Sequence, residues 1–132
     1  MTPAKAHESS ESPKLVAITD RSFAFSVRII NLCKFLEKQS DISRTLINQL
    51  LAAATSVGAN LEEAVAGQSK ADFIHKNAIA LKEARESNYW LRLIIATNKF
   101  KPPVMTGILE LERESSEIAK IVAKRIVSTK RN

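Results

Sequence analysis

Five polar residues are the first candidates for chemistry in this chain: Asn60, Glu63, Glu83, Glu86 and Ser87. Glu63 follows Asn60 by three residues, and Glu86 and Ser87 follow Glu83 by three and four. These spacings place each group on the face of a helix that a bundle normally fills with apolar side chains. Carboxylates at such positions cost free energy unless they are paired or hydrogen-bonded. We therefore predict a structural polar layer, buried or half-buried between two helices. A ligand-binding site at the same place is the alternative.

A dinuclear metal site is a second chemistry that these carboxylates could support. Ferritin-like carboxylate bundles use inward glutamates and two Glu-x-x-His pairs, whereas this chain offers one carboxylate-x-x-His pair, from Asp72 to His75. Asp72 is better explained as part of a helix cap, and His7 lies outside any predicted helix. The sequence therefore predicts no metal site and no cofactor, and a carboxylate-lined metal or ligand-binding bundle remains an alternative.

Nucleophilic catalysis has no supporting pattern of residues. The chain has no serine elbow, no Gly-rich phosphate loop and no Cys–His pairing with positional logic. Its one cysteine, Cys33, excludes an intrachain disulfide and a cysteine-based zinc site. The apolar helical pattern around Cys33 predicts a buried thiol. We therefore expect the protein not to be an enzyme.

Basic residues are the third candidates, because the chain carries a net charge of +6 with 20 Lys and Arg against 14 Asp and Glu. Such an excess permits binding to nucleic acid, although helix-dipole complementation or a merely solvated face would also account for it. The sequence shows no aromatic platform of the kind that binds single strands. The candidate contacts to phosphate are Lys120, Lys124, Arg125, Lys130 and Arg131 near the C-terminus, with Arg85 and Arg92 before them.

The elements that must position these residues are four helices, predicted from apolar spacings of three and four. Short reversals between them give an all-α, up-down-up-down antiparallel four-helix bundle. The predicted helices cover residues 20–39, 42–66, 70–98 and 104–128. The predicted organisation is a flexible N-terminal tail (1–17), the bundle (18–128) and a basic C-terminal end (129–132).

Residues between the helices predict how each helix begins and ends. Thr19 or Asp20 is expected to cap the first helix and Ser40 or Asp41 the second, while Ser69 with Asp72 resembles a capping box. Gly67 is expected to end the second helix in the left-handed backbone conformation. The Pro102–Pro103 pair is expected to end the third helix. On the second helix the expected buried stripe is Ile42, Leu46, Gln49, Ala53, Ser56, Asn60 and Glu63, beside a neighbouring apolar stripe of Ile47, Leu50, Ala54, Val57 and Leu61.

The other three helices each have an expected buried stripe of the same spacing. On the first helix it is Ile18, Ser22, Phe25, Ile29, Leu32 and Leu36. On the third it is Phe73, Asn77, Ala80, Ala84, Ser87, Leu91 and Ile94, and on the fourth Val104, Ile108, Leu111, Ser115, Ile118 and Val122.

Two helices carry a second apolar stripe that a lone bundle does not need. Phe23, Val27 and Ile30 form it on the first helix, and Trp90 belongs to the one on the third. We interpret these stripes as surface covered by other copies of the chain, with a broad monomer core as the alternative. No apolar run reaches about 18 residues and no secretory segment is apparent, so a cytoplasmic protein without a membrane role is expected.

The segment from residue 45 to 95 resembles the four-helix-bundle family of 23S rRNA intervening-sequence proteins. The matching motifs are Asn60-Leu-Glu-Glu63, Ser69-Lys-x-Asp72-Phe73, Ile79-Ala80 and the stretch from Glu83 to Trp90. The resemblance implies a cytoplasmic bacterial protein that assembles as a ring of five bundles. It also implies kinship with the accessory proteins of diversity-generating retroelements, which are basic pentamers that bind nucleic acid and a reverse transcriptase.

These observations favour a non-enzymatic, homo-oligomeric bundle that binds nucleic acid, RNA rather than DNA, through a basic surface. One alternative is a scaffold whose partner is a protein, such as a reverse transcriptase, with the charge serving solubility. The other alternative is the carboxylate-lined metal or ligand-binding bundle.

Overall fold

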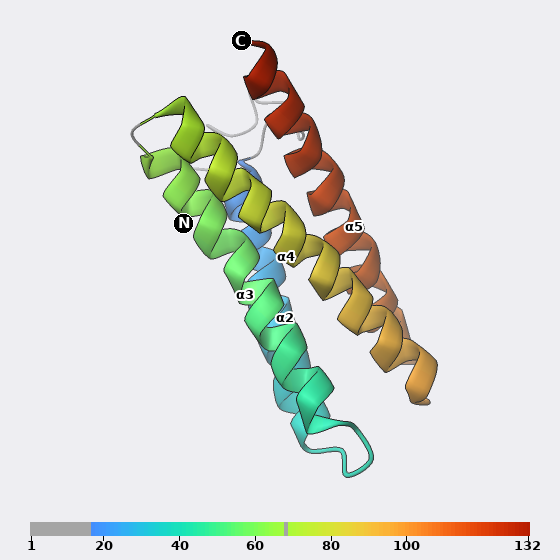
Figure 1. The fold of residues 1–132 in the computed structure, drawn as a ribbon. Helices are drawn as coiled ribbons and strands as arrows, with labels where there is room; N and C mark the ends of the chain where they lie inside the picture. The colour runs from blue at the N-terminus through green and yellow to red at the C-terminus, as the bar shows by residue number, and fades with distance from the viewer. Residues whose placement is uncertain (1–16, 68) are drawn as a thin grey trace, which may run out of the picture.

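The computed structural model describes residues 17–67 and 69–132, which form four helices and, within those residues, no strand. The helices are α2 (Ile18–Glu37), α3 (Arg44–Ala66), α4 (Lys70–Thr97) and α5 (Pro102–Arg131). Consecutive helices run in opposite directions, so the chain forms the predicted antiparallel four-helix bundle (Figure 1). The predicted tail falls almost wholly on residues 1–16, which lie outside the described residues.

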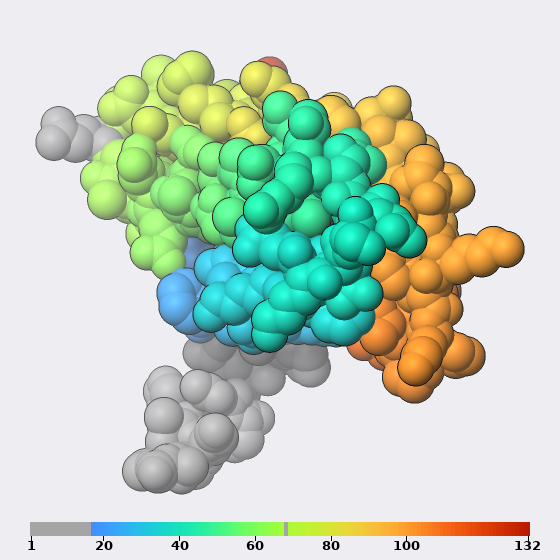
Figure 2. Space-filling model, turned by 90° about the horizontal axis from the view of Figure 1, so that it is seen from below, coloured from blue at the N-terminus to red at the C-terminus, as the bar shows by residue number. Residues whose placement is uncertain are grey.

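The four helices pack in the order of the chain, each against the next, and α5 returns to α2. The α3–α4 and α4–α5 pairs pack most extensively, whereas α2 and α5 make the smallest of these contacts. A hollow of about 330 Å³ lies between α2 and α5, lined by residues such as Leu32, Phe35 and Val104. At one end of the bundle the α2–α3 and α4–α5 links lie beside each other (Figure 2).

The predicted buried stripes of α4 and α5 are confirmed almost residue by residue. Buried positions on α4 are Asn77, Ala80, Ala84, Ser87, Leu91 and Ile94, and on α5 they are Ile108, Leu111, Ser115, Ile118 and Val122. On α2 the stripe is also confirmed, with Cys33 more buried than Leu32. Spacing of three and four residues thus identifies the core where each helix has one main stripe facing its neighbours.

The predicted buried stripe of α3 is confirmed only for Ala53 and for Ile42, which lies just before the helix. The core instead takes Ile47, Leu50, Ala54, Val57 and Leu61, while Gln49 and Glu63 are exposed. Both stripes have the same spacing, but the second presents more apolar area, and the free energy of burial scales with that area. The bundle therefore turns the polar stripe of α3 towards its edge.

The caps of α2 and α3 differ from the prediction, whereas the N-cap of α4 agrees with it. Ala17 occupies the N-cap position of α2 without a side-chain hydrogen bond, and Ser43 caps α3 by accepting a bond from the Leu46 amide at 3.2 Å. The Ser69 cap is confirmed, since its hydroxyl accepts from the Asp72 amide at 3.0 Å. Gly67 is extended, with φ of −64°, and is not left-handed.

The two prolines begin α5 and do not adjoin the end of α4. Proline suits the first positions of a helix because its missing N–H is not needed there. Pro102 and Pro103 occupy those positions in α5, and α4 ends at Thr97 with Asn98 donating back to the Ile94 carbonyl at 3.0 Å. At its other end α5 continues to Arg131, so residues predicted as a separate basic end belong to the last helix.

The predicted second stripes have different outcomes on the two helices. On α2, the side chains of Phe23, Val27 and Ile30 remain exposed in the single chain. On α4, Trp90 is half-buried and packs against the core. No helix among residues 17–67 and 69–132 is both long and apolar enough to span a bilayer.

The same substitution at two valines of α3, one buried and one exposed, tests this description of the core. Val57 is 0% exposed and Val65 is 63% exposed. We expect Val57→Ala to lower the free energy of unfolding by about 2 kcal/mol, since it removes apolar area and leaves a cavity. Val65→Ala should change it by no more than about 0.5 kcal/mol. Urea denaturation followed by circular dichroism measures both, and equal effects would contradict the placement of α3.

Candidate functional site

The five residues of the predicted polar layer do not form a shared layer in the single chain. Asn60 Nδ2 donates to the Ser56 carbonyl at 2.8 Å, and Ser87 Oγ donates to the Glu83 carbonyl at 2.9 Å. Both bonds stay within one helix. Among the described residues, no hydrogen bond links a member of this set on α3 to a member on α4. Ser87 is buried, and the side chains of Asn60 and Ser87 are each satisfied by the backbone of their own helix.

Glu63 is the residue for which burial was wrongly predicted. Its side chain is 63% exposed, and Oε1 lies 2.7 Å from Nζ of Lys76 on α4. A long carboxylate side chain at the edge of a helix can reach both water and a neighbouring cation, so it does not have to be buried. The pair links α3 to α4 at the surface, where such ion pairs contribute little to stability.

Glu83 and Glu86 are half-buried on α4 and lie one turn apart. Burial raises the pKa of the Glu83 carboxyl above its ordinary value, the negative charge of Glu86 adds to the effect, and Lys82 opposes it. Neither glutamate makes an ion pair within the described residues. These two carboxylates are therefore a small electrostatic cost to the fold.

The described residues contain no arrangement of side chains suited to metal binding or to thiol chemistry. No group of three or more His, Cys, Asp or Glu side chains there is placed to hold a metal ion. Cys33 is buried as predicted, with Sγ 3.8 Å from the Ile47 carbonyl oxygen. Burial, followed by the charge of Glu37, raises the pKa of the Cys33 thiol to about 11. A nucleophilic thiolate is thus disfavoured at neutral pH.

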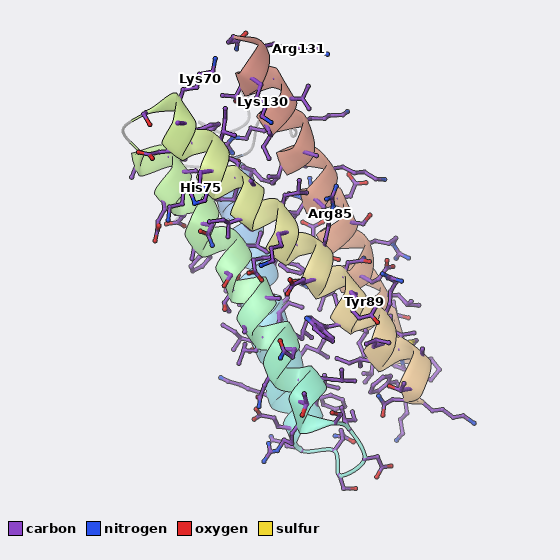
Figure 3. All side chains as sticks on the ribbon, viewed as in Figure 1. Lys70, His75, Arg85, Tyr89, Lys130 and Arg131 are labelled. Atoms are coloured by element: carbon purple, nitrogen blue, oxygen red, sulfur yellow. The ribbon has the colours of Figure 1, made fainter. Side chains whose placement is uncertain are left out.

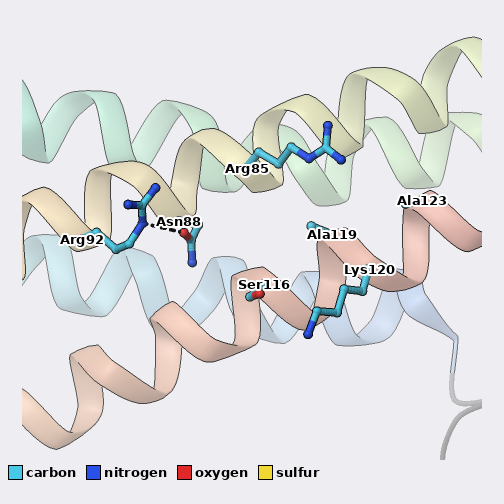
Figure 4. A pocket seen from close by; sticks show the side chains of 7 residues that line it. All are labelled: Arg85, Asn88, Arg92, Ser116, Ala119, Lys120 and Ala123. Carbon is cyan, nitrogen blue, oxygen red and sulfur yellow. Dashed lines mark hydrogen bonds between the residues drawn. The ribbon is translucent and has the colours of Figure 1, made fainter.

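Three of the predicted cations meet in a groove between α4 and α5, which we call the α4–α5 groove. Arg85 and Arg92 come from α4 and Lys120 from α5 (Figure 4). The groove has a volume of about 450 Å³. The two arginines are seven residues apart, which is about 10.5 Å along a helix axis. The remaining lining residues are Asn88, Ser116, Ala119 and Ala123.

Asn88 fixes the shape of the α4–α5 groove, and the sequence analysis did not identify it. Its Nδ2 donates across to α5, at 3.0 Å to the Glu112 carbonyl and 3.1 Å to Ser115 Oγ. Its Oδ1 accepts from Arg92 Nε at 2.9 Å (Figure 4). Asn88 therefore ties the two helices together and orients the base of the Arg92 guanidinium. The only sign of this role in the sequence is that Asn88 directly follows Ser87, a residue of the expected buried stripe.

The cations of the α4–α5 groove have few carboxylate partners among the described residues. Within the described residues, neither Arg85 nor Arg92 makes an ion pair, and Lys120 Nζ is 3.9 Å from Glu117 in a mostly exposed pair. By contrast, Arg21 on α2 binds Glu114 through two hydrogen bonds of 2.7 and 2.9 Å. Arg21 and Arg28 of α2 are thus paired with glutamates of α5, whereas Arg85 and Arg92 of α4 make no ion pair within the described residues.

Three of the other predicted cations, Lys124, Lys130 and Arg131, lie further along α5. Lys124 and Arg131 line a second hollow on α5, which shares Ala123 with the α4–α5 groove and so continues it. Lys130 and Arg131 lie at the C-terminal end of α5, the end of the bundle that also carries Lys70 (Figure 3).

Arg125 differs from these cations because it packs against α4. Its guanidinium carbon lies 4.8 Å from the centroid of the Phe73 ring. Burial lowers the pKa of the Arg125 guanidinium. Arg125 therefore serves the packing of α5 on α4, and it is less available to a ligand than predicted.

Comparison with known proteins finds a matching family model and similar solved structures. The sequence model of a family described as 23S rRNA-intervening sequence protein matches residues 14–124. A solved structure of a protein of unknown function from the S23 ribosomal protein family of Bacteroides thetaiotaomicron is 41% identical, with a TM-score of 0.74. That match covers 83% of this chain and 98% of the other. No curated protein matches.

Glu83 provides a test of the electrostatics on α4. A carboxyl whose pKa is raised by folding destabilises the folded state once ionised, so its effect appears as pH rises through the acid range. We expect Glu83→Gln to raise the free energy of unfolding at pH 7 by about 0.5 kcal/mol or less. The difference from the unaltered protein should vanish at pH 3. Urea denaturation at both pH values, with exposed Glu62→Gln as control, measures it. A destabilised Glu83→Gln protein at pH 7 would contradict this account.

Proposed function

The chain belongs to the family of 23S rRNA-intervening sequence proteins, and from this premise we propose that it is a non-enzymatic bundle that binds nucleic acid, RNA in the first place. The observation that supports the proposal is the α4–α5 groove, where Arg85, Arg92 and Lys120 gather without strong carboxylate partners among the described residues. Uncompensated cations in a concave surface attract a polyanion, and a groove focuses their field.

The chemistry of the groove suits a sugar-phosphate backbone. A guanidinium donates two parallel hydrogen bonds to a phosphate, and Lys120 adds a point charge from the facing helix. Ser116 and Asn88 place neutral polar groups between the cations. Lys124 and Arg131 continue the positive surface along α5 towards the C-terminus. Contacts of this kind bind phosphate without reading base sequence.

We further propose that the protein is a homo-oligomer, with five copies as the resemblance implies. The support is the exposed apolar stripe on α2, where Phe23 is 63%, Val27 42% and Ile30 37% exposed. A contiguous apolar stripe on a soluble bundle is typical of a surface that another chain covers. Repetition of the α4–α5 groove around an assembly would convert weak phosphate contacts into avidity.

A protein scaffold is the second candidate function, and the same α2 stripe supports it. The hollow between α2 and α5, with Phe35 and Pro103 in its lining, adds a second apolar surface on α2. A protein partner, such as a reverse transcriptase by kinship of the family, would cover these residues. In that case the charge of the α4–α5 groove would contribute only to solubility.

The binding proposal predicts a defined decrease in affinity when charge is removed from the α4–α5 groove. The variant Arg85→Gln with Lys120→Gln should weaken binding of any RNA about tenfold or more at low salt. For a single strand, the slope of log Kd against log salt should fall by about 0.7 for each phosphate that the variant no longer neutralises. Fluorescence anisotropy with labelled RNA over a range of salt concentrations measures both quantities.

The matched control is Lys38→Gln with Arg44→Gln, which removes the same charges from exposed positions near the α2–α3 link. It should leave the affinity within about twofold, because long-range attraction between exposed charges is screened by salt. If the unaltered protein bound no nucleic acid at low salt, or if both variants weakened binding equally, the scaffold function would be favoured.

The assembly proposal predicts an effect of a charge placed on α2. Val27→Asp should dissociate the oligomer, because a carboxylate in an apolar interface loses its hydration. Val65→Asp, the same change at a more exposed valine on α3, is the control and should leave the mass unchanged. Size exclusion with light scattering gives the mass of each protein. A monomeric unaltered protein at micromolar concentration would refute the assembly.

A further inference from the structure

Tyr89 is an exposed aromatic residue on the same face of α4 as two cations of the α4–α5 groove. It follows Arg85 by four residues and precedes Arg92 by three, so the three side chains lie next to one another on the helix surface. The ring is 47% exposed. Figure 3 shows Arg85 and Tyr89 projecting from the outer side of α4. Among the described residues, the other well-exposed aromatic side chains, Phe23 and Phe35, lie on α2.

The Tyr89 ring is held in place by its neighbours on two sides. The ring of Trp90 meets it edge to face, with centroids 5.3 Å apart and an interplanar angle of 67°. The Arg92 guanidinium carbon lies 5.4 Å from its centroid, and Arg92 is itself oriented by Asn88. A tyrosine has only two side-chain torsions, so a ring restrained in this way loses little further entropy when it binds a flat partner.

We propose that Tyr89 stacks on an unpaired base of single-stranded RNA while Arg85 and Arg92 bind the phosphates to either side of it. This inference rests on the proposed function and adds the kind of nucleic acid that the α4–α5 groove accepts. Bases of a duplex are already stacked and paired, so an exposed ring can reach only a base that is unpaired. Unpaired bases are presented mainly by the loops and ends of RNA.

The spacing of the three side chains agrees with this arrangement. Arg85 and Arg92 are separated by about 10.5 Å along the helix axis, the length of about three nucleotides of a stacked strand. Tyr89 lies between them, so a base on the ring leaves a phosphate one or two nucleotides away on each side near one of the two guanidinium groups. The cations alone would bind a duplex as well, and the ring adds a preference for single strands.

The test compares two substitutions of Tyr89 on two forms of RNA. Tyr89→Leu should weaken binding of a short unstructured RNA roughly 5- to 100-fold, the usual range for removal of one base–aromatic stack. It should leave binding of a blunt duplex of the same length within about twofold, because a duplex has no free base for the ring. Tyr89→Phe keeps the ring and should bind the single strand as the unaltered protein does. Fluorescence anisotropy at low salt measures all six pairs.

Crosslinking of the unaltered protein gives a readout that does not depend on how well a variant folds. RNA containing 4-thiouridine, irradiated in the complex, should attach to Tyr89. Trypsin cleaves after Arg85 and Arg92, so the adduct should appear by mass spectrometry on the peptide spanning residues 86–92. Crosslinks found only elsewhere would overturn the proposal, even if Tyr89→Leu bound weakly.

The outcomes separate this inference from the proposed function. If the protein bound no nucleic acid at low salt, both would fail together. If it bound duplex and single-stranded RNA equally and Tyr89→Leu changed neither affinity, the proposed function would stand and the stacking would be refuted. Single-stranded DNA of the same sequence should bind no more tightly than the RNA. A clear preference for the DNA would overturn the assignment to RNA.

Discussion

Close approach of α4 to both of its neighbours is the constraint on which the rest of the bundle depends. Its inner stripe contains Ala80, Ala84 and Ser87, each 0% or 1% exposed. Small side chains let helices pack closely, so α4 makes the most extensive contacts in the bundle, with α3 on one side and α5 on the other. Arg85 and Arg92 lie away from this stripe, on the exposed side of α4.

The distribution of charge follows from this arrangement. Two glutamates of α5 meet arginines of α2, as Glu114 meets Arg21 at 2.7 Å and Glu110 meets Arg28 at 3.0 Å. Towards α4, Glu112 is occupied by a hydrogen bond from Asn88 at 2.9 Å. These carboxylates of α5 are thus occupied with neighbouring helices, and Arg85 and Arg92 of α4 make no ion pair within the described residues.

The sequence predicted the parts of the structure that depend on a single dominant pattern. The buried stripes of α2, α4 and α5 could be predicted because the main apolar stripe of each runs along most of the helix, whereas the second stripe of α2 is shorter. On α3 two stripes had the same spacing, and the choice depended on the volumes of residues such as Ile47 and Leu50 against the whole bundle. The cations of the site were identified from charge alone. Asn88 and the packing of Arg125 on Phe73 could not be, because they depend on which residues of α4 face which residues of α5.

The small contact between α2 and α5 determines where the bundle unfolds locally with the least free energy. This side of the bundle has a hollow between the helices and relies in part on the Arg21 and Arg28 ion pairs, which salt screens. Regions with fewer buried apolar contacts unfold locally at lower free energy than the rest of a domain. We therefore expect amide hydrogens of α2 to exchange with solvent earlier than those of α4, which is packed on both sides. The helix that its own chain holds least firmly is also the one with the exposed apolar stripe, so a neighbouring chain would stabilise it most.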